Sequence, residues 1–173
     1  RAASYSITKH SLWALDILAE LGFAYDSSIF PVHHDRYGIP GSPRWPYRLH
    51  TSSGGSLVEF PPSTLAVSGQ RLPVAGGGYF RIYPYRLTRF ALSRINRMER
   101  RPFIFYLHPW EIDPEQPRIR AGRLSTFRHY TNLSRCEARL RWLLRDFRFV
   151  PAGDVLEGLA IPAVTTHQAF VAA

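Results

Sequence analysis

Segment 103–111, with the sequence FIFYLHPWE, constrains the fold of this chain more than any other stretch. Five apolar or aromatic residues run directly into His108. A run that is apolar on both faces predicts a strand buried between layers, here over 103–107. In parallel α/β sheets, the loops at the carboxyl ends of strands usually carry the chemistry, so His108 is the first candidate catalytic residue. The alternative is a histidine that caps the strand and hydrogen-bonds a neighbouring loop.

Length and composition indicate one globular unit. A chain of 173 residues can bury about 70% of its unfolded surface, and 45% hydrophobic with 20% charged residues argues against disorder. We expect a domain over 1–160 and a frayed tail over 161–173. No apolar run approaches the roughly 20 residues of a transmembrane helix. Cys136 is the only cysteine, which excludes an internal disulfide and a cysteine metal cage.

The chain carries a formal net charge of +9 and has a pI of about 10.3, values that raise nucleic acid as a partner. However, a single lysine, Lys9, stands against 21 arginines, and these are spread along the sequence. Such a pattern is typical of coding bias, so we do not expect nucleic acid to bind. A basic nucleic-acid-binding protein remains an alternative, and its signature would be a steep salt dependence of DNA binding.

Three amphipathic helices are predicted. The first follows Thr8 and ends at Gly22, the second covers 83–100, and the third starts at Ser134. We expect the first to pack on a sheet and the other two to bury one apolar face. The expected faces are Leu12, Leu15, Leu18 and Leu21 in the first helix, Leu87, Phe90, Ala91, Ile95 and Met98 in the second, and Leu140, Leu143, Leu144 and Phe147 in the third.

Asp26 is the second candidate catalytic residue. A short predicted strand over 23–25 ends at Asp26, Ser27 and Ser28, which again places polar groups at a strand's carboxyl end. The alternative is an ordinary turn or cap aspartate.

The predicted loop over 29–55 is long, contains many prolines and glycines, and carries the sequence HHDRY at 33–37. Long loops in compact domains are usually functional or disordered, and the aromatic residues favour an ordered loop that faces substrate. His34 and Tyr37 are therefore candidate substrate-binding residues. His33 and His34 cannot both reach one metal ion from a strand, so the loop does not predict a complete metal site.

Three glycines, Gly76 to Gly78, precede Tyr79 and Phe80. No lysine and Ser/Thr pair follows them, so they do not form a phosphate-binding loop. They are better explained by a close approach of the backbone to a ligand or to a neighbouring strand.

The order of the predicted elements, with helices between strands, indicates an α/β fold with parallel strands. The strands are too few for a closed barrel, which typically takes about 250 residues. Because half a barrel leaves two open sheet edges, we expect an N-terminal portion to be missing.

Five motifs resemble the carboxyl-terminal part of the polysaccharide deacetylases of the NodB-homology superfamily, which are similar to carbohydrate esterase family 4. They cover most of 1–149. The nearest subfamily is found in exopolysaccharide loci of bacteria with exosortase-type sorting systems and carries a C-terminal domain of unknown function. The motifs are RAASYSI, YDSSIFPVHHDRYGIP, EFPPST, LPVAGGGYFRIYPY and FYLHPWEIDPEQPR, in this order.

The resemblance implies a deformed (β/α) barrel that holds a divalent, zinc-like metal ion through an aspartate and two histidines, with another aspartate as general base. Arg1 resembles the arginine that orients this base, although Ala3 stands where proline is usual. Asp26 resembles the aspartate that pairs with the arginine, without the tryptophan that often follows. His108 resembles the histidine that protonates the departing amine.

Neither the TFDD-like nor the His-x-x-x-His-like motif is present, so the chain contains no complete metal site. The resemblance therefore implies a C-terminal fragment or truncated product of an enzyme that deacetylates N-acetylated sugars of an exopolysaccharide or cell-wall glycan. We expect the fragment to be inactive alone. The alternative is a non-catalytic carbohydrate-binding or interaction module in which Tyr37, Tyr79 and Trp110 form a platform for sugars.

Overall fold

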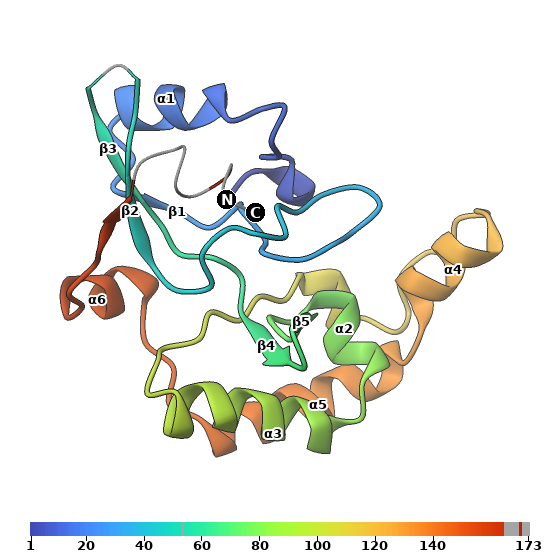
Figure 1. The fold of residues 1–173 in the computed structure, drawn as a ribbon. Helices are drawn as coiled ribbons and strands as arrows, with labels where there is room; N and C mark the ends of the chain where they lie inside the picture. Colours follow the sequence, from blue (N-terminus) through green and yellow to red (C-terminus); the bar gives the residue numbers. More distant parts are fainter. Residues whose placement is uncertain (53, 165–169, 171–173) are drawn as a thin grey trace. The chain divides into compact units, whose positions relative to one another are not determined.

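A computed structural model describes residues 1–52, 54–164 and 170, and its secondary structure is mixed α/β, as predicted (Figure 1). The chain divides into two compact units. One comprises Arg1–Leu72 together with Pro151–Ala173 and is called the sheet unit below. The other, Pro73–Val150, is called the helical unit.

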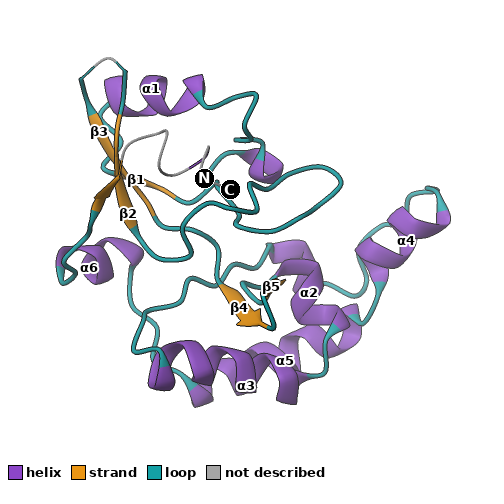
Figure 2. Cartoon of the chain, in the orientation of Figure 1, coloured by secondary structure: helices purple, strands orange, loops and turns teal. Residues whose placement is uncertain are grey.

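The sheet unit contains a four-stranded sheet of strand order β1-β3-β2-β6 (Figure 2). The strands are β1 (Tyr25–Asp26), β2 (Tyr47–His50), β3 (Ser56–Glu59) and β6 (Ala163–Val164). β1 is parallel to β3 and β6 is parallel to β2, whereas β2 and β3 are antiparallel. The sheet is thus mixed, and the strands of the described residues do not close into a barrel, as expected for a chain with too few strands.

β6 lies within the predicted tail, so this part of the tail is ordered as a strand. Phe170 is also described, and its side chain is 2% exposed. The remaining tail residues, 165–169 and 171–173, lie outside the described residues.

Helix α1 (Trp13–Glu20) ends where the sequence predicts. Gly22 has a φ of 78°, and the N–H of Phe23 donates to the carbonyl of Leu18 at 3.0 Å, which together form a glycine-dependent C-cap. The predicted start at Thr8 is wrong, because the N–H of Thr8 donates to Ser11 Oγ at 2.9 Å in a turn ahead of the helix.

The predicted face of α1 is only partly buried. Leu15 is 4% exposed, but Leu21 is 70% exposed because it follows the last turn of the helix. The core beneath α1 joins the helix to the sheet and to the loop after β1. Its buried members are Ile7, Leu15, Ile29, Ile39, Tyr47, Leu49, Leu57 and Phe170.

Three smaller elements complete the sheet unit. They are a 3₁₀ turn at Ala3–Tyr5, a hairpin of β4 (Thr64–Val67) and β5 (Gln70–Pro73), and helix α6 (Ala152–Glu157). The two hairpin turn residues, Ser68 and Gly69, both have positive φ, as a type I′ turn requires.

The helical unit consists mainly of helices and long connections. Its elements are α2 (Gly77–Ile82), α3 (Tyr85–Ser93), the π-helical turn Arg94–Met98, the 3₁₀ turn Pro109–Ile112, α4 (Arg123–Tyr130) and α5 (Leu133–Asp146). Of the 21 arginines, 16 lie in this unit, with only six acidic residues. The arginines are therefore concentrated here, although the expectation that nucleic acid does not bind stays a prediction.

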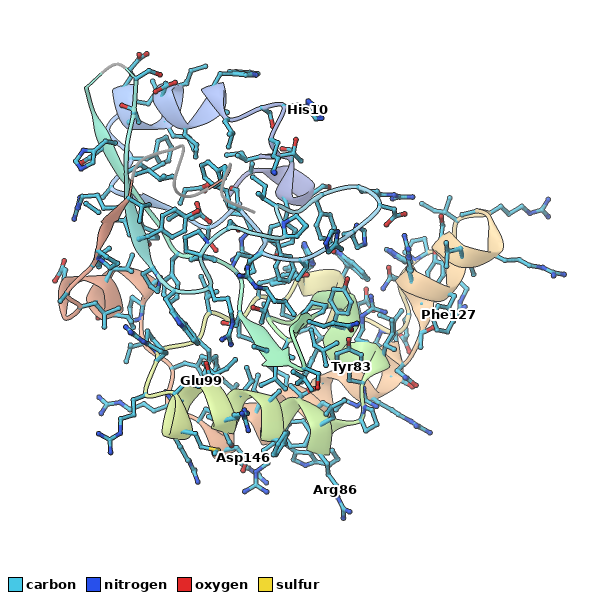
Figure 3. All side chains as sticks on the ribbon, viewed as in Figure 1. His10, Tyr83, Arg86, Glu99, Phe127 and Asp146 are labelled. Carbon is cyan, nitrogen blue, oxygen red and sulfur yellow. The ribbon has the colours of Figure 1, made fainter. Side chains whose placement is uncertain are left out.

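The buried face of α3 differs from the predicted one. Ala91 and Ile95 are buried, but Leu87, Phe90 and Met98 are 41%, 57% and 68% exposed. Thr88 and Leu92 complete the buried face instead. Arg86 and Asp146, which belong to α3 and α5, are labelled in Figure 3, and Asp146 Oδ2 lies 3.1 Å from Nε of Arg89.

The predicted face of α5 is correct for Leu143 and Phe147, which are buried. It is wrong for Leu144, which is 57% exposed. Leu133, Cys136 and Arg139 occupy the rest of the buried face. Arg139 can lie there because its guanidinium donates hydrogen bonds to the main-chain carbonyls of Phe80, Arg81 and Tyr83.

The predicted buried strand over 103–107 is wrong. The segment is extended, but its only β-bridge among the described residues joins Tyr106 to Gly76, and its side chains are half-buried. Phe103 packs edge-on against Phe147, and Phe105 packs edge-on against Phe80. The segment is apolar because its aromatic side chains pack against other rings of the unit, and not because it is a central strand of a sheet.

The predicted close approach at the glycines is confirmed, with the bridge segment as the neighbour. The N–H of Tyr106 donates to the carbonyl of Ala75 at 2.7 Å, and the N–H of Gly77 donates to the carbonyl of Tyr106 at 3.1 Å. A Cβ at Gly76 would overlap with the Tyr106 carbonyl, and one at Gly77 would overlap with the Tyr106 ring. Only glycine fits at these two positions.

Among the described residues, none of the helices has the length and apolar composition that crossing a bilayer requires.

Candidate functional site

The predicted site residues are divided between the two units. Arg1, Asp26, His34 and Tyr37 belong to the sheet unit, whereas Tyr79, His108 and Trp110 belong to the helical unit.

His108 is held by Glu111, a residue that the sequence analysis does not single out. The two residues close the 3₁₀ turn reciprocally, because the N–H of Glu111 donates to the His108 carbonyl and the N–H of His108 donates to Glu111 Oε2, each at 2.9 Å. Oε2 also lies 3.1 Å from Nδ1 of the imidazole. The carboxylate is fully buried, whereas the imidazole is 54% exposed.

Arg81 fixes the other side of Glu111. Its Nε donates to Glu111 Oε1 at 2.9 Å, and the side chains are 2% and 0% exposed. The remaining guanidinium N–H groups donate to the carbonyls of Arg128, His129 and Thr131 at 2.8–2.9 Å. The charge of Glu111 is thus compensated by a cation whose three nitrogens all donate hydrogen bonds within the protein, which is the arrangement that makes a buried ion pair tolerable.

Aromatic rings extend the cluster from His108. Trp110 lies stacked at 5.6 Å from the His108 ring and at 4.1 Å from the His129 ring, and the Arg81 guanidinium carbon is 5.1 Å from the Trp110 ring. Burial, followed by the positive charge of Arg81, lowers the pKa of His129 from its ordinary value. Tyr79 contacts Tyr83 instead, at 5.9 Å.

This geometry suits a histidine that exchanges a proton with a ligand. The Glu111 carboxylate orients the imidazole through Nδ1. In the described part of the chain, Nε2 of His108 makes no hydrogen bond. The imidazole therefore has one nitrogen fixed by the protein and one available to a bound molecule.

In the sheet unit, the structure brings Arg1 and Asp26 together. Nε and Nη2 of Arg1 donate to the carbonyl and hydroxyl of Ser27 at 2.9 and 3.1 Å, and the main-chain nitrogen of Arg1 lies 3.1 Å from Asp26 Oδ1. Ser28 links the same segments, because its hydroxyl accepts from the N–H of Ala2 and donates to Asp26 Oδ1 at 2.9 Å. The Arg1 side chain thus hydrogen-bonds to Ser27, the residue after Asp26.

Asp26 lies beside a second buried carboxyl group, that of Glu59. The two residues are paired in register between the parallel strands β1 and β3, and Glu59 is paired with Tyr47 between β3 and β2. Burial, followed by the charge of Asp26, raises the pKa of Glu59 well above its ordinary value. Burial, followed by the charges of Glu59 and Asp26, also raises the pKa of Tyr47.

The two candidate residues of the long loop contact each other. The ring of His34 stacks on that of Tyr37 at 3.7 Å, and Tyr37 is also parallel to Phe30 at 5.9 Å. Nδ1 of His34 accepts from the N–H of Arg36 at 3.1 Å and lies 3.0 Å from Asp35 Oδ1. The loop is thus ordered by its own side chains.

A comparison with protein families assigns the greater part of this chain. Residues 27–157 match the domain of unknown function DUF3473. The chain belongs to the DUF3473 family. This domain is associated with polysaccharide deacetylase-like proteins of exosortase loci. No curated protein and no solved structure matches the chain.

The family match covers all the candidate residues except Arg1 and Asp26. It contains the whole cluster of His108, Glu111 and Arg81, whereas Arg1 and Asp26 precede it. The helical cluster is therefore part of the DUF3473 domain itself. The roles of the candidate residues in catalysis and substrate binding stay predictions.

The described residues of this DUF3473 chain do not suit a metal ion. Nowhere in 1–52, 54–164 or 170 do three His, Cys, Asp or Glu side chains come together in a way that could hold one. The ring of His34 is used within its loop, and both oxygens of Glu111 are taken by protein donors. No chemical step through a metal ion is derived from this chain.

The sequence carried a usable signal for two of the missed residues. Glu111 follows His108 by three residues. At this spacing, a glutamate side chain can accept a hydrogen bond from the N–H of the residue that begins the helical turn. Glu59 is the first residue of the motif EFPPST and follows the apolar residues Leu57 and Val58 of β3. Arg81 offered no signal, because its partners are backbone carbonyls nearly 50 residues away.

Proposed function

We propose that this chain is the C-terminal part of a metal-dependent polysaccharide N-deacetylase that acts on N-acetylated sugars of an exopolysaccharide or cell-wall glycan. The five motifs that resemble the NodB-homology superfamily support this function, as does membership in DUF3473, whose domains are associated with deacetylase-like proteins.

The observation that carries the proposal is the exposed His108 imidazole held on the buried Glu111 carboxylate at 3.1 Å. In the proposed reaction, water adds to the acetamide carbonyl. The C–N bond then breaks, so that the sugar amine leaves and acetate is formed. His108 gives the proton of its Nε2 to the departing amine, while Glu111 holds the imidazole in place through Nδ1. Arg81 keeps Glu111 in place and is a positioning residue.

In this proposal, the general base and the zinc-like divalent metal ion belong to motifs that the chain lacks. The metal ion would polarise the carbonyl and lower the pKa of the attacking water. We therefore expect the chain to be inactive by itself.

The carbohydrate-binding alternative needs open aromatic faces. The described side chains already use one face of Trp110 for His129 and one face of Tyr37 for His34. These stacks leave less aromatic surface for a sugar ring than the sequence alone suggests.

The test compares this chain with the same chain joined to an N-terminal segment that carries both missing motifs. Each is assayed for acetate release from N-acetylated glycan oligomers, with and without added Zn²⁺. Circular dichroism and stoichiometric Zn²⁺ binding establish that the extended form is folded. We expect metal-dependent acetate release from the extended form only. A folded, metal-loaded extended form that binds the glycan without releasing acetate would favour the binding module.

A further inference from the structure

Three polar side chains form a buried row across neighbouring strands of the sheet unit. Asp26 on β1, Glu59 on β3 and Tyr47 on β2 are paired in register, so their side chains emerge on the same face of the sheet. They are 3%, 0% and 1% exposed. Their hydrogen bonds therefore have to be found within the protein.

One atom of each side chain has no partner. Asp26 Oδ1 accepts from the Ser28 hydroxyl, and Glu59 Oε1 accepts from the N–H of Ile29 at 2.9 Å. The remaining atoms, Asp26 Oδ2, Glu59 Oε2 and the Tyr47 hydroxyl, are buried without a hydrogen bond to any described residue. Each unsatisfied buried polar atom costs about 1–3 kcal/mol, and more if it is charged.

We propose that Glu59 is protonated and gives this proton to Asp26 as a hydrogen bond, so that Glu59 is the positioning residue for the Asp26 carboxylate. One proton between Oε2 of Glu59 and Oδ2 of Asp26 supplies both carboxyl groups with the bond they lack. The Tyr47 hydroxyl completes the row by donating to the pair.

The charges around the pair support a single shared proton. Asp26 and Glu59 would carry two negative charges in a buried site if both were ionised, and the charge of Asp26 disfavours the ionised form of Glu59. The groups that face Glu59 are Asp26, Tyr47 and the main-chain nitrogen of Arg1. Arg1 directs its guanidinium to Ser27, so the described contacts provide no side-chain cation for Glu59.

The pair gives Asp26 a fixed orientation and a single negative charge next to Arg1. This functional role rests on the proposed deacetylase reaction, in which the Arg1 and Asp26 motifs tune the general base. The shared proton itself does not depend on that reaction and can be measured without it.

The first test uses the chain with ¹³C-labelled glutamate carboxyl groups and follows their chemical shifts from pH 4 to pH 9. We expect one glutamate to remain a protonated acid at pH 7, unlike glutamate in an unstructured peptide, and its signal to disappear in Glu59→Gln. The control Glu157→Gln, on an exposed glutamate of α6, should leave that signal in place. If every glutamate of the folded wild-type chain is ionised at pH 7, the proposal is wrong, even where a variant fails to fold.

The second test separates positioning from catalysis in the extended, metal-loaded form. Glu59→Gln keeps a donor toward Asp26 and should retain most of kcat, whereas Glu59→Leu has no donor and should lower kcat with little change in KM. Equal losses in both variants would overturn the positioning role. An inactive wild-type extended form would count against the proposed function, while the carboxyl titration would still decide the shared proton.

Discussion

Arg81 and Glu111 form an ion pair that is closed off from solvent, with Nε of the arginine 2.9 Å from Oε1 of the glutamate. The second oxygen of the same carboxylate holds both the N–H and the ring of His108. An exposed histidine is thus connected through one carboxylate to a buried arginine that also fastens the end of α4. The Glu111 carboxylate therefore contributes both to the buried ion pair and to the orientation of the proposed proton donor.

Replacement of Arg81 by methionine should destabilise the chain strongly. The change leaves the Glu111 carboxylate buried without its cation and removes the donors of three carbonyls, so we expect a loss of about 3–5 kcal/mol in the free energy of unfolding. Urea unfolding measures this loss. The matched control Arg86→Met, at an exposed position of α3, should change stability by no more than about 0.5 kcal/mol. Similar values for the two variants would show that the ion pair is not buried in solution.

Alanine at Gly76 should be much more damaging than alanine at Gly69. Both glycines have positive φ, at 119° and 77°, but a Cβ at Gly69 meets open space, whereas one at Gly76 overlaps with the Tyr106 carbonyl. We expect a cost of about 1–2 kcal/mol at Gly69 from backbone strain alone, and about 3 kcal/mol or more at Gly76. Thermal or urea unfolding of the two variants checks this difference. Equal costs would mean that segment 103–107 does not approach the glycines.

The thiol of Cys136 should be unreactive in the folded chain. Its side chain is fully buried, and burial raises its pKa to about 11, so little thiolate forms near neutral pH. A colorimetric disulfide reagent at pH 8 should therefore react slowly with the native chain and rapidly in denaturant. Rapid reaction under native conditions would contradict the packing of α5.

His129 should make the chain less stable in mild acid. Its pKa is lowered in the folded state, so the unfolded chain takes up a proton at the ordinary value of 6.5 before the folded chain does. Unfolding is then favoured as the pH falls through 6.5 toward the lower folded value. The NMR titration of the His129 ring should show a lower midpoint in the folded chain than in urea. An equal or higher midpoint would contradict the burial beside Arg81.

The sequence predicted those features that depend on local chemistry. The α/β class, the end of α1 at Gly22 and the close approach at Gly76 each follow from periodicity or from the freedom of glycine. The buried side of α5 was predicted in part, since Leu143 and Phe147 are in the core.

Features that depend on distant partners were not predicted. The apolar run at 103–107 lacks a strand ladder because hydrophobicity does not reveal whether a pairing strand exists. On α3 the small Thr88 takes a buried position that the larger Leu87 was expected to fill. The ion pair of Arg81 with Glu111 joins positions 30 residues apart and left no periodic signal.

In the helical unit, His108 and Trp110 were singled out from the sequence, but the buried residues around them were not. His108 was found because it follows an apolar run, while the buried groups that orient it were missed. Asp26 was found for the same reason, but its neighbour Glu59 was not singled out. Sequence reasoning favours polar residues next to apolar runs and overlooks polar residues within the core.

The central claim is that His108, oriented by Glu111, donates the proton in deacetylation. The most direct measurement is the pH dependence of kcat for acetate release by the extended, metal-loaded form, compared with His108→Gln and with the neighbouring His129→Gln as a matched control. We expect kcat to fall by about 10²–10⁴-fold in His108→Gln, with loss of the limb that reports the acid, and to change little in His129→Gln. Full activity of His108→Gln with an unchanged pH profile would contradict the account.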